Sequence, residues 1–429
     1  MRFKKLDEWL AWQETLHPST IELGLDRVLS VYKALQNQTT LPVVITVAGT
    51  NGKGSTLAML EAILLADGYR VGKYISPHLY RYNERVQINA QAVDDQSLCH
   101  AFERIDQARR DTSLTYFEFG TLAALDIFHH ADLDVVLLET GLGGRLDAVN
   151  IIDSDVSIIT SIDLDHTDWL GATRELIGHE KFGIARPGKP CIVGELQPPQ
   201  AVLDKASASG VQLMLAGQTF SCALPAAGQG NGWHFINSDS RIELPLPALR
   251  GEHQIRNASC VVMCIQCLRE KLGVSMASIR TGLAGVSLAG RFEVRTEKGI
   301  TCVQDVAHNP AAAAALAQAL LNMPTPGVRR AVFGAMADKD LVGLLTPMRA
   351  LIDHWYLAPL EMPRAATVEQ IRNVLVNIGV ERSQIHCMEE MADAKQQALQ
   401  NSQQYDQVVV FGSFFTLEAA EYSAANVIN

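Results

Sequence analysis

The sequence lacks several features that would assign it to whole classes of protein. No run of 18 apolar residues occurs, which is the length that a membrane-spanning helix requires, and acidic residues interrupt the basic N-terminus before any apolar segment. Charged residues make up 19% of the chain, and the net charge of −11 argues against a general nucleic-acid binder. We therefore expect a cytoplasmic, globular protein with neither a membrane anchor nor a nucleic-acid partner.

Cysteine pairs with the spacing of a zinc site are also scarce. Only Cys264 and Cys267 form a CxxC, and no second ligand pair follows at comparable spacing. Together with Cys260 they lie on one face of the apolar segment 258–268 if it is helical. We predict buried, reduced thiols and no zinc site.

A glycine-rich loop around Lys53 is the most informative stretch that is present. Glycines stand at positions 49, 52 and 54, a β-branched run precedes the loop at 42–47, and residues 57–65 have helical apolar spacing. Glycine N–H groups, a helix N-terminus and a lysine ammonium group together bind phosphate. The context predicts a P-loop for a nucleotide. A GTPase switch is excluded because the chain has no Asn-Lys-x-Asp for guanine.

Strands and helices are expected to alternate along the chain, which predicts an α/β fold with a parallel sheet covered on both faces. Further strands are expected in the first part of the chain at 134–139, 156–160 and 191–194, with a loop-rich stretch at 222–232 and a hairpin of 233–236 with 241–244. A second alternating set has strands at 301–305, 330–333, 354–357, 384–387 and 407–411 and a helix at 310–321.

With 429 residues, the chain exceeds the size of one core. We expect a P-loop NTPase-like parallel-sheet domain at 1–288, followed by a smaller Rossmann-like α/β domain at 289–429.

Acidic residues and a histidine follow two of the expected strands. Glu139 ends an apolar run like a Walker-B acid, and Mg²⁺ prefers such oxygen ligands. An acid that merely ends a strand is the alternative. The glycine-rich segment 141–147 is a weak dinucleotide fingerprint, because its third glycine is missing. His166 stands among acids in 163–168, which favours a metal ligand over a core histidine.

The motif Gly-Thr-Asn-Gly-Lys-Gly-Ser at 49–55 resembles the Mur ligase superfamily, and ordered motifs along nearly the whole chain resemble its bacterial bifunctional dihydrofolate synthase/folylpolyglutamate synthase family. The matching segments are 20–27, the P-loop, 76–79, 83–85, 115–121, 139–150, 165–171, 180–181, 290–292, 305–310 and 412–414.

The resemblance implies a role for each matching residue, with ATP and Mg²⁺ as cofactors and a monovalent cation such as K⁺ also compatible. The nucleotide would be held by Thr50, Asn51, Gly52, Lys53, Gly54, Ser55, Asn257, Arg291 and Asp305. The metal ligands would be Ser76, Glu139, His166 and Lys181, the last as a carbamylated lysine. The acid and glutamate would be bound by Thr20, Ile21, Glu22, Leu23, Phe117, Glu118, Phe119, Gly120, Leu146, Asp147, Ala148, His308 and Ser413. The catalytic groups would be Lys53, His166, Lys181 and Arg291.

The implied reaction transfers the γ-phosphoryl group of ATP to a carboxylate, and a glutamate amine then attacks the acyl phosphate. Dihydropteroate, reduced folates and L-glutamate would be the substrates of what we expect to be a monomer, with closure of its two domains. The chain departs from the family at Phe182, where a small residue is usual, and at Phe415, which replaces a frequent histidine.

Three alternatives stay open. A Mur-type ligase for a UDP-sugar would carry a UDP-binding domain before the P-loop, whereas few residues precede Gly49. A folylpolyglutamate synthase that lacks dihydrofolate synthase activity would not need the intact segment Thr20–Arg27, which favours recognition of dihydropteroate. A nucleotide-binding scaffold would have no use for Glu139, His166 and Lys181 beside an intact P-loop.

Overall fold

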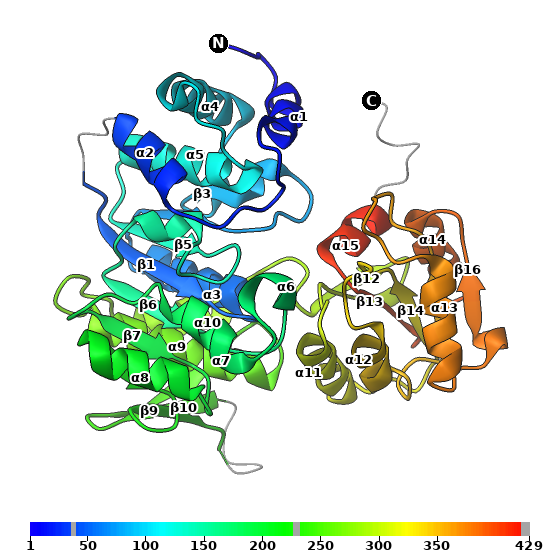
Figure 1. The fold of residues 1–429 in the computed structure, drawn as a ribbon. Coiled ribbons are helices and arrows are strands. Elements are labelled where there is room, and N and C mark those ends of the chain that lie inside the picture. The colour runs from blue at the N-terminus through cyan, green and yellow to red at the C-terminus, as the bar shows by residue number, and fades with distance from the viewer. Residues whose placement is uncertain (36–39, 226–231, 422–429) are drawn as a thin grey trace. The chain divides into compact units, whose positions relative to one another are not determined.

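The computed structural model describes residues 1–35, 40–225 and 232–421, and it divides into two compact units (Figure 1). Unit 1 consists of Met1–Ala248 and Gln254–Val286, and unit 2 of Leu249–His253 and Ser287–Asn429. The functions expected of the domains on either side of residue 288 stay predictions.

An eight-stranded sheet forms the centre of unit 1, with strand order β4-β3-β2-β5-β1-β6-β7-β8. The strands are β1 (Val43–Ala48), β2 (Val71–Tyr74), β3 (Val86–Ile88), β4 (Gln91–Ala92), β5 (Val135–Glu139), β6 (Val156–Ile159), β7 (Pro190–Val193) and β8 (Gln212–Leu215). All neighbours are parallel except β2–β3 and β3–β4. The expected parallel α/β fold is confirmed, with an antiparallel edge that the sequence did not reveal.

Helices cover this sheet on both faces, as the alternating pattern predicted (Figure 1). The helices of this part of the chain are α1 (Leu6–Leu16), α2 (Asp26–Ala34), α3 (Lys53–Ala66), α4 (Asp95–Arg109), α5 (Tyr116–His130), α6 (Thr167–Leu170), α7 (Arg174–Phe182), α8 (Gln200–Ser209), α9 (Glu252–Cys267) and α10 (Met276–Gly285). Short 3₁₀ turns lie at Tyr82–Arg85 and Ala148–Ile151.

An aromatic cluster joins α1 to α4 and α5. The ring of Trp9 lies 5.8 Å from that of Phe102 and 6.4 Å from that of Phe119, and all three side chains are fully buried. Such aromatic pairs add to the free energy of apolar burial. The cluster anchors the N-terminal segment 17–25, which follows α1, against α5.

A small antiparallel sheet contains the expected hairpin. β10 (Gly232–Asn237) pairs with β11 (Arg241–Pro245), as predicted, and also with β9 (Phe220–Ala223). The expectation of loop structure from Cys222 is wrong at its start, because Cys222 and Ala223 belong to β9, which forms hydrogen bonds with β10. The rest of that expected loop, at 226–231, lies outside the described residues.

Unit 2 is built on a six-stranded sheet with order β12-β13-β17-β14-β15-β16. The strands are β12 (Glu293–Glu297), β13 (Ile300–Asp305), β14 (Arg329–Phe333), β15 (His354–Leu357), β16 (Ile385–Cys387) and β17 (Gln407–Phe411). The helices are α11 (Pro310–Leu321), α12 (Leu341–Leu345), α13 (Val368–Asn377), α14 (Met391–Gln400) and α15 (Phe414–Glu421). Short 3₁₀ turns lie at Thr346–Met348 and Arg382–Gln384. Five predicted strands are confirmed. The antiparallel edge strand β12 was missed because its charged residues hide any apolar period.

The thiols of α9 behave as predicted. Cys260 and Cys264 are buried, Cys267 is partly buried, and none of the three forms a disulfide. Burial raises the pKa of Cys260 to about 12, which keeps this thiol protonated at neutral pH. No helix in the described ranges combines the length and apolarity needed to cross a bilayer.

The P-loop helix α3 depends on a close approach by α10. A Cβ atom on Gly282 would lie 2.5 Å from the backbone N and Cα of Ile63. We predict that Gly282→Ala forces the helices apart and lowers the free energy of unfolding by about 1–3 kcal/mol. The measurement is urea unfolding followed by tryptophan fluorescence.

The matched control is Gly285→Ala in the same helix, where a Cβ atom would meet nothing within 4 Å. This change should be neutral or stabilising, because alanine favours helix. Equal stability of the two variants would show that the contact between α10 and α3 is not tight.

Candidate active site

Four neighbouring parallel strands of unit 1 end at one edge of the sheet. In the order β2-β5-β1-β6, Tyr74 aligns with Leu138, Val47 with Glu139, and Ala48 with Ile159. The segments that follow carry Ser76, the P-loop and residues 160–166. Ligands in open α/β sheets bind outside the carboxyl ends of such strands. The expected P-loop and the carboxylate of Glu139 are therefore side by side.

The P-loop is held in place by the segment that follows β6. The backbone N–H of Asn51 donates to Ser161 Oγ at 3.0 Å, and its carbonyl accepts from Thr160 Oγ1 at 2.6 Å. Thr50 Oγ1 accepts from the N–H of Asp163 at 3.0 Å. These bonds fix the loop conformation before any ligand binds.

The P-loop leads directly into α3. Gly52 adopts φ +88°, which glycine tolerates best, and Lys53 is the first residue of the helix. Lys53 Nζ donates to the carbonyl of Gly49 at 3.0 Å. Gly54 and the buried Ser55 follow in the first turn, so N–H groups at the helix N-terminus face the loop. The arrangement suits an anion.

Two amides on α9 approach this loop. A Cβ atom on Gly52 would lie 2.8 Å from Oδ1 of Asn257. Asn257 Nδ2 donates to Gln254 Oε1 at 3.0 Å, and Gln254 Nε2 donates to Ser55 Oγ at 3.3 Å. Gln254 therefore orients the amide of Asn257. Gln254 was not among the residues expected at this site, although its spacing of three from Asn257 places both on one helix face.

The expected metal ligands Ser76 and Glu139 lie together. Ser76 donates its backbone N–H to Glu139 Oε2 at 3.3 Å, and Glu139 is only 5% exposed. His166 is the N-cap residue that precedes α6, with φ 50°, and its Nε2 lies 4.0 Å from Asp165 Oδ2. No three His, Cys, Asp or Glu side chains in the described ranges gather as a metal site by themselves. A divalent cation at this position would need Ser76 and a carbamylated Lys181 as further ligands.

Lys181 lies in the same electrostatic environment as Lys53. Burial, and then repulsion by Lys53, lower the pKa of Lys181 to about 7, while Asp165 and Asp147 act in the opposite direction. A protonated lysine would repel a metal ion, whereas the lowered pKa makes the neutral amine, which can be converted to a carbamate, accessible near pH 7. The neighbouring Phe182 packs in a hydrophobic cluster with Ile177.

Asp147 organises the glycine-rich loop that follows β5. Its two carboxylate oxygens accept from the N–H groups of Leu142 at 2.8 Å and Val149 at 3.0 Å. Burial raises the pKa of Asp147 to about 6, although these hydrogen bonds oppose the shift. Ala148 follows in a buried 3₁₀ turn. The N–H of Gly24 donates to the carbonyl of Leu146 at 3.3 Å, which joins this loop to the N-terminal segment.

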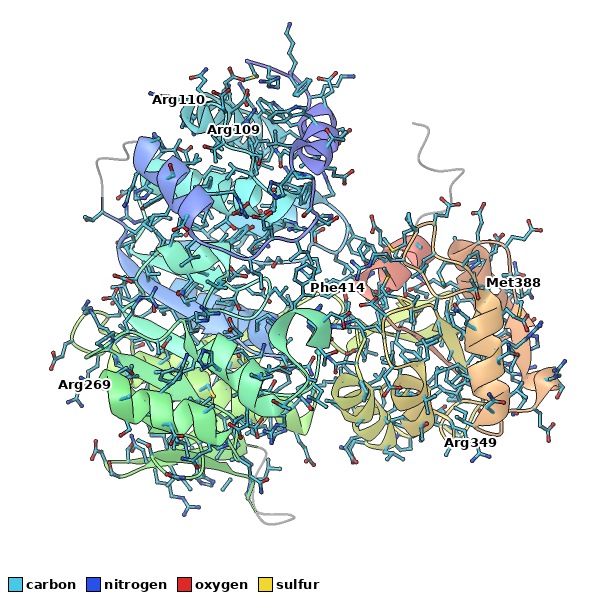
Figure 2. The ribbon with its side chains drawn as sticks, viewed as in Figure 1. Arg109, Arg110, Arg269, Arg349, Met388 and Phe414 are labelled. Atoms are coloured by element: carbon cyan, nitrogen blue, oxygen red, sulfur yellow. The ribbon has the colours of Figure 1, made fainter. Side chains whose placement is uncertain are left out.

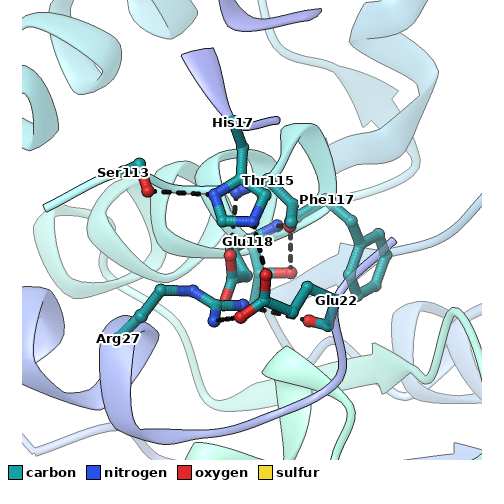
Figure 3. Close-up of polar contacts among 8 residues, drawn as sticks. His17, Glu22, Arg27, Ser113, Thr115, Phe117 and Glu118 are labelled. Atoms are coloured by element: carbon teal, nitrogen blue, oxygen red, sulfur yellow. Dashed lines mark hydrogen bonds and ion pairs between the residues drawn. The ribbon is translucent and has the colours of Figure 1, made fainter. Parts of the chain in front are cut away.

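A chain of polar contacts ties the segment 17–27 to the start of α5 (Figure 3). Glu22 receives hydrogen bonds from His17, at 2.8 Å, and from Arg27. Arg27 also donates to Glu118 Oε1 at 3.1 Å, and Glu118 forms a capping box with Thr115. The hydrogen bond from His17, followed by Arg27, lowers the pKa of Glu22. This network, including His17 and Arg27, was not recognised as such in the sequence.

The remaining residues expected to line the acid pocket differ in exposure. The side chains of Thr20 and Glu22 are exposed, whereas Ile21 and Leu23 are partly buried. Phe117 is partly buried, and its ring would lie 2.6 Å from a Cβ atom on Gly141. The ring of Phe119 lies in the core instead, where it packs on Trp9. Gly120 is also buried, and a Cβ atom there would lie 2.6 Å from the hydroxyl of Tyr82.

The expected residues of unit 2 gather at the carboxyl edge of β13 and β17. Asp305 and Phe411 align at this edge. Arg291 lies over the ring of Phe414, 5.1 Å from its centroid, and that ring is labelled at the start of α15 (Figure 2). Burial raises the pKa of Asp305, and Arg291 opposes the shift.

The hydroxyl and imidazole groups at the same edge make local contacts. His308 Nδ1 lies 2.8 Å from the carbonyl of Val306, and its ring lies 6.4 Å from that of Phe414. Ser413 Oγ accepts from the N–H of Thr416 at 3.0 Å, as a helix cap does. Phe415, where the sequence departs from the family pattern, is 41% exposed.

Comparison with known proteins yields matches over nearly the whole chain. Residues 290–414 match the family model of the Mur ligase, glutamate ligase domain. The chain is 44% identical to a dihydrofolate synthase/folylpolyglutamate synthase of Escherichia coli, over 96% of this chain and 94% of that protein. It is 41% identical to the enzyme of the same name from Haemophilus influenzae, over 96% of each chain.

Solved structures give the same result. The structure of E. coli FolC in complex with DHPP and ADP superposes with a TM-score of 0.90 and 43% identity, covering 97% of this chain and 96% of that one. The Yersinia pestis bifunctional folylpolyglutamate synthase/dihydrofolate synthase, complexed with AMPPNP and Mn ion, has a TM-score of 0.88 and 45% identity over 97% of each chain. A bifunctional relative with Mn, AMPPNP and L-glutamate bound has a TM-score of 0.88 and 44% identity over 98% of each chain.

Proposed function

The chain belongs to the dihydrofolate synthase/folylpolyglutamate synthase family and is therefore an ATP-dependent ligase, and we propose that it adds L-glutamate first to 7,8-dihydropteroate and then to reduced folates. The observation that carries this proposal is the shared sheet edge of unit 1. It combines a P-loop, a buried carboxylate beside Ser76, and the loop at Asp147 that contacts the N-terminal segment.

The P-loop residues Thr50–Ser55, with Asn257, are the proposed binding site for the phosphates and nucleotide. The N–H groups at the start of α3 and the ammonium group of Lys53 offer positive charge where the γ-phosphoryl group would leave. Arg291 and Asp305 of unit 2 are further proposed nucleotide contacts. The product of this step would be an acyl phosphate and ADP.

The metal site fits the donors that are present. Ser76, Glu139, His166 and carbamylated Lys181 would hold Mg²⁺, and a monovalent ion such as K⁺ is compatible with the proposal. When bound, the dication would neutralise charge on the phosphate oxygens. Glu139 is buried at the same sheet edge as the P-loop, and the backbone N–H of Ser76 donates to its Oε2 at 3.3 Å, so two of the proposed ligands lie together.

The acid would occupy the region formed by segments 20–23, 117–120 and 146–148. Glu22 and Glu118 are held by Arg27, which fixes polar acceptors at one end of this region before the substrate binds. His308 and Ser413 are proposed contacts for the incoming glutamate. We further propose that the protein is a cytoplasmic monomer that takes only small-molecule substrates and binds neither nucleic acid nor membrane.

A direct assay tests the proposal. Release of ADP should require magnesium, glutamate and an acid, and mass spectrometry should detect dihydrofolate when the acid is dihydropteroate. Turnover with reduced folates but never with dihydropteroate would reduce the function to folylpolyglutamate synthesis. Turnover only with a UDP-muramoyl acid would refute the assignment in favour of a cell-wall ligase.

Lys53→Ala is predicted to lower kcat by about 10²-fold or more, because it removes a charge from the phosphoryl-transfer site. The unfolding midpoint should stay near that of the wild type, since Lys53 Nζ makes one hydrogen bond to Gly49. Steady-state assays at saturating ATP provide the measurement. An unchanged kcat would remove Lys53 from the mechanism.

Carbamylation of Lys181 is predicted to rise with pH. Only the neutral amine adds CO₂, and with a pKa of about 7, compared with 10.5 for an ordinary lysine, this form dominates at pH 8. At pH 6 roughly a tenth of the amines are neutral. Activity at limiting bicarbonate should therefore increase between pH 6 and pH 8, and ¹³C-bicarbonate should give a carbamate NMR signal.

The carbamate signal should disappear in Lys181→Gln and persist in a matched control, Lys189→Gln. Lys189 lies on the surface of the same unit and pairs with Asp155 at 3.3 Å. A signal that survives in Lys181→Gln would assign the modification to another amine.

A further inference from the structure

Arg85, at the end of the 3₁₀ turn Tyr82–Arg85, is held on several sides. Its Nε donates to Nδ1 of His78 at 2.8 Å. The guanidinium carbon lies 5.3 Å from the ring centroid of Tyr82 and 5.6 Å from that of Tyr116. A hydrogen bond and two aromatic faces fix the plane of the guanidinium group before any ligand binds.

The loop that carries Arg85 is also rigidly built. The carboxylate of Glu84 accepts hydrogen bonds from the backbone N–H groups of Leu79, Tyr80 and Arg81 at 2.7, 3.0 and 2.8 Å. Three bonds to one carboxylate close the loop on itself. The position of Arg85 therefore does not depend on a bound substrate.

Arg85 has no counter-charge in the described part of the chain. The carboxylate of the adjacent Glu84 is used by the loop backbone, and Asp95 accepts from Asn83 at 2.9 Å and pairs with Arg81 at 3.4 Å. A partly buried guanidinium group without an anionic partner is energetically costly. The arrangement fits a site whose anion arrives with the substrate.

The surroundings of Arg85 indicate which substrate would supply the anion. The same loop begins at Ser76, which contacts Glu139. On the other side, Tyr116 begins α5 and precedes Phe117, one of the residues expected to line the acid pocket. Arg85 thus contacts both the segment with the proposed metal ligands and the helix with the proposed acid contacts.

We propose that Arg85 binds the α-carboxylate of the terminal glutamyl residue of a folate substrate. The inference rests on the proposed function and specifies the substrate group at this position. Dihydropteroate has a single carboxylate, which must react, whereas a folate has an α-carboxylate beside the reacting γ-carboxylate. A carboxylate bound by a guanidinium fork donates its lone pairs to N–H groups and is a poor nucleophile. Arg85 therefore takes the carboxylate that does not react.

The test compares both acids in the same enzyme. Arg85→Gln should lower kcat/KM for tetrahydrofolate roughly ten- to a hundred-fold more than kcat/KM for dihydropteroate, as expected for the loss of a charge-assisted bidentate contact. The loss for tetrahydrofolate should appear mainly as an increase in KM. The matched control is Arg81→Gln on the same loop, whose exposed side chain pairs with Asp95 and which should leave the ratio within about two-fold of the wild type.

A substrate analogue makes the test independent of general damage to the loop. In this analogue, γ-aminobutyrate replaces the terminal glutamate of tetrahydrofolate, so that the α-carboxylate is absent. The wild type should discriminate strongly against the analogue, and Arg85→Gln should discriminate little. Arg85→Lys keeps the charge and should show an intermediate preference, and it carries the test if the glutamine variant does not fold.

Two results would overturn the inference. One is an equal loss of kcat/KM for both acids, and the other is a variant that discriminates against the analogue as strongly as the wild type. If the wild-type enzyme used neither dihydropteroate nor tetrahydrofolate, the proposed function itself would fail, which is a different outcome.

Discussion

The parallel alignment of β2, β5, β1 and β6 is the constraint on which the rest of unit 1 depends. Because these strands run in one direction and are neighbours, four segments that are distant in the sequence emerge at one edge. The pairing of Val47 with Glu139 puts the P-loop beside a buried carboxylate. A shift of one residue in this register would turn Glu139 to the opposite face of the sheet. Strand pairing therefore brings together the groups on which the proposed chemistry depends.

Electrostatics supplies the second condition. A protein with a net charge of −11 must attract a triphosphate with a local positive field, which here comes from the start of α3 and from Lys53. Lys181 is close enough to Lys53 for repulsion to contribute to its low pKa. Burial is the largest cause of this low pKa, and it makes the neutral form of the Lys181 amine accessible near pH 7.

The sequence predicted the parts of the site that follow local rules. The P-loop was recognisable because glycines, a lysine, a strand and a helix occur in a fixed order, and Glu139 because it ends an apolar run. The edge strand β12 escaped because Glu293 and Arg295 belong to an exposed edge whose partner, β13, determines its structure. The contact of Arg27 with Glu118 joins segments on either side of the P-loop strand, and that of Arg85 with Tyr116 joins two segments that follow it. No period or spacing in one sequence encodes them.

The central claim is that the edge shared by β2, β5, β1 and β6 binds the divalent cation and the nucleotide together. A crystal structure with Mn²⁺, a non-hydrolysable ATP analogue and bicarbonate tests it most directly, because manganese gives an anomalous signal. The account predicts one strong anomalous peak bounded by Ser76, Glu139, His166 and a carbamylated Lys181, with phosphate oxygens on the P-loop side. A manganese peak away from these four residues, with the nucleotide in a separate pocket, would contradict it.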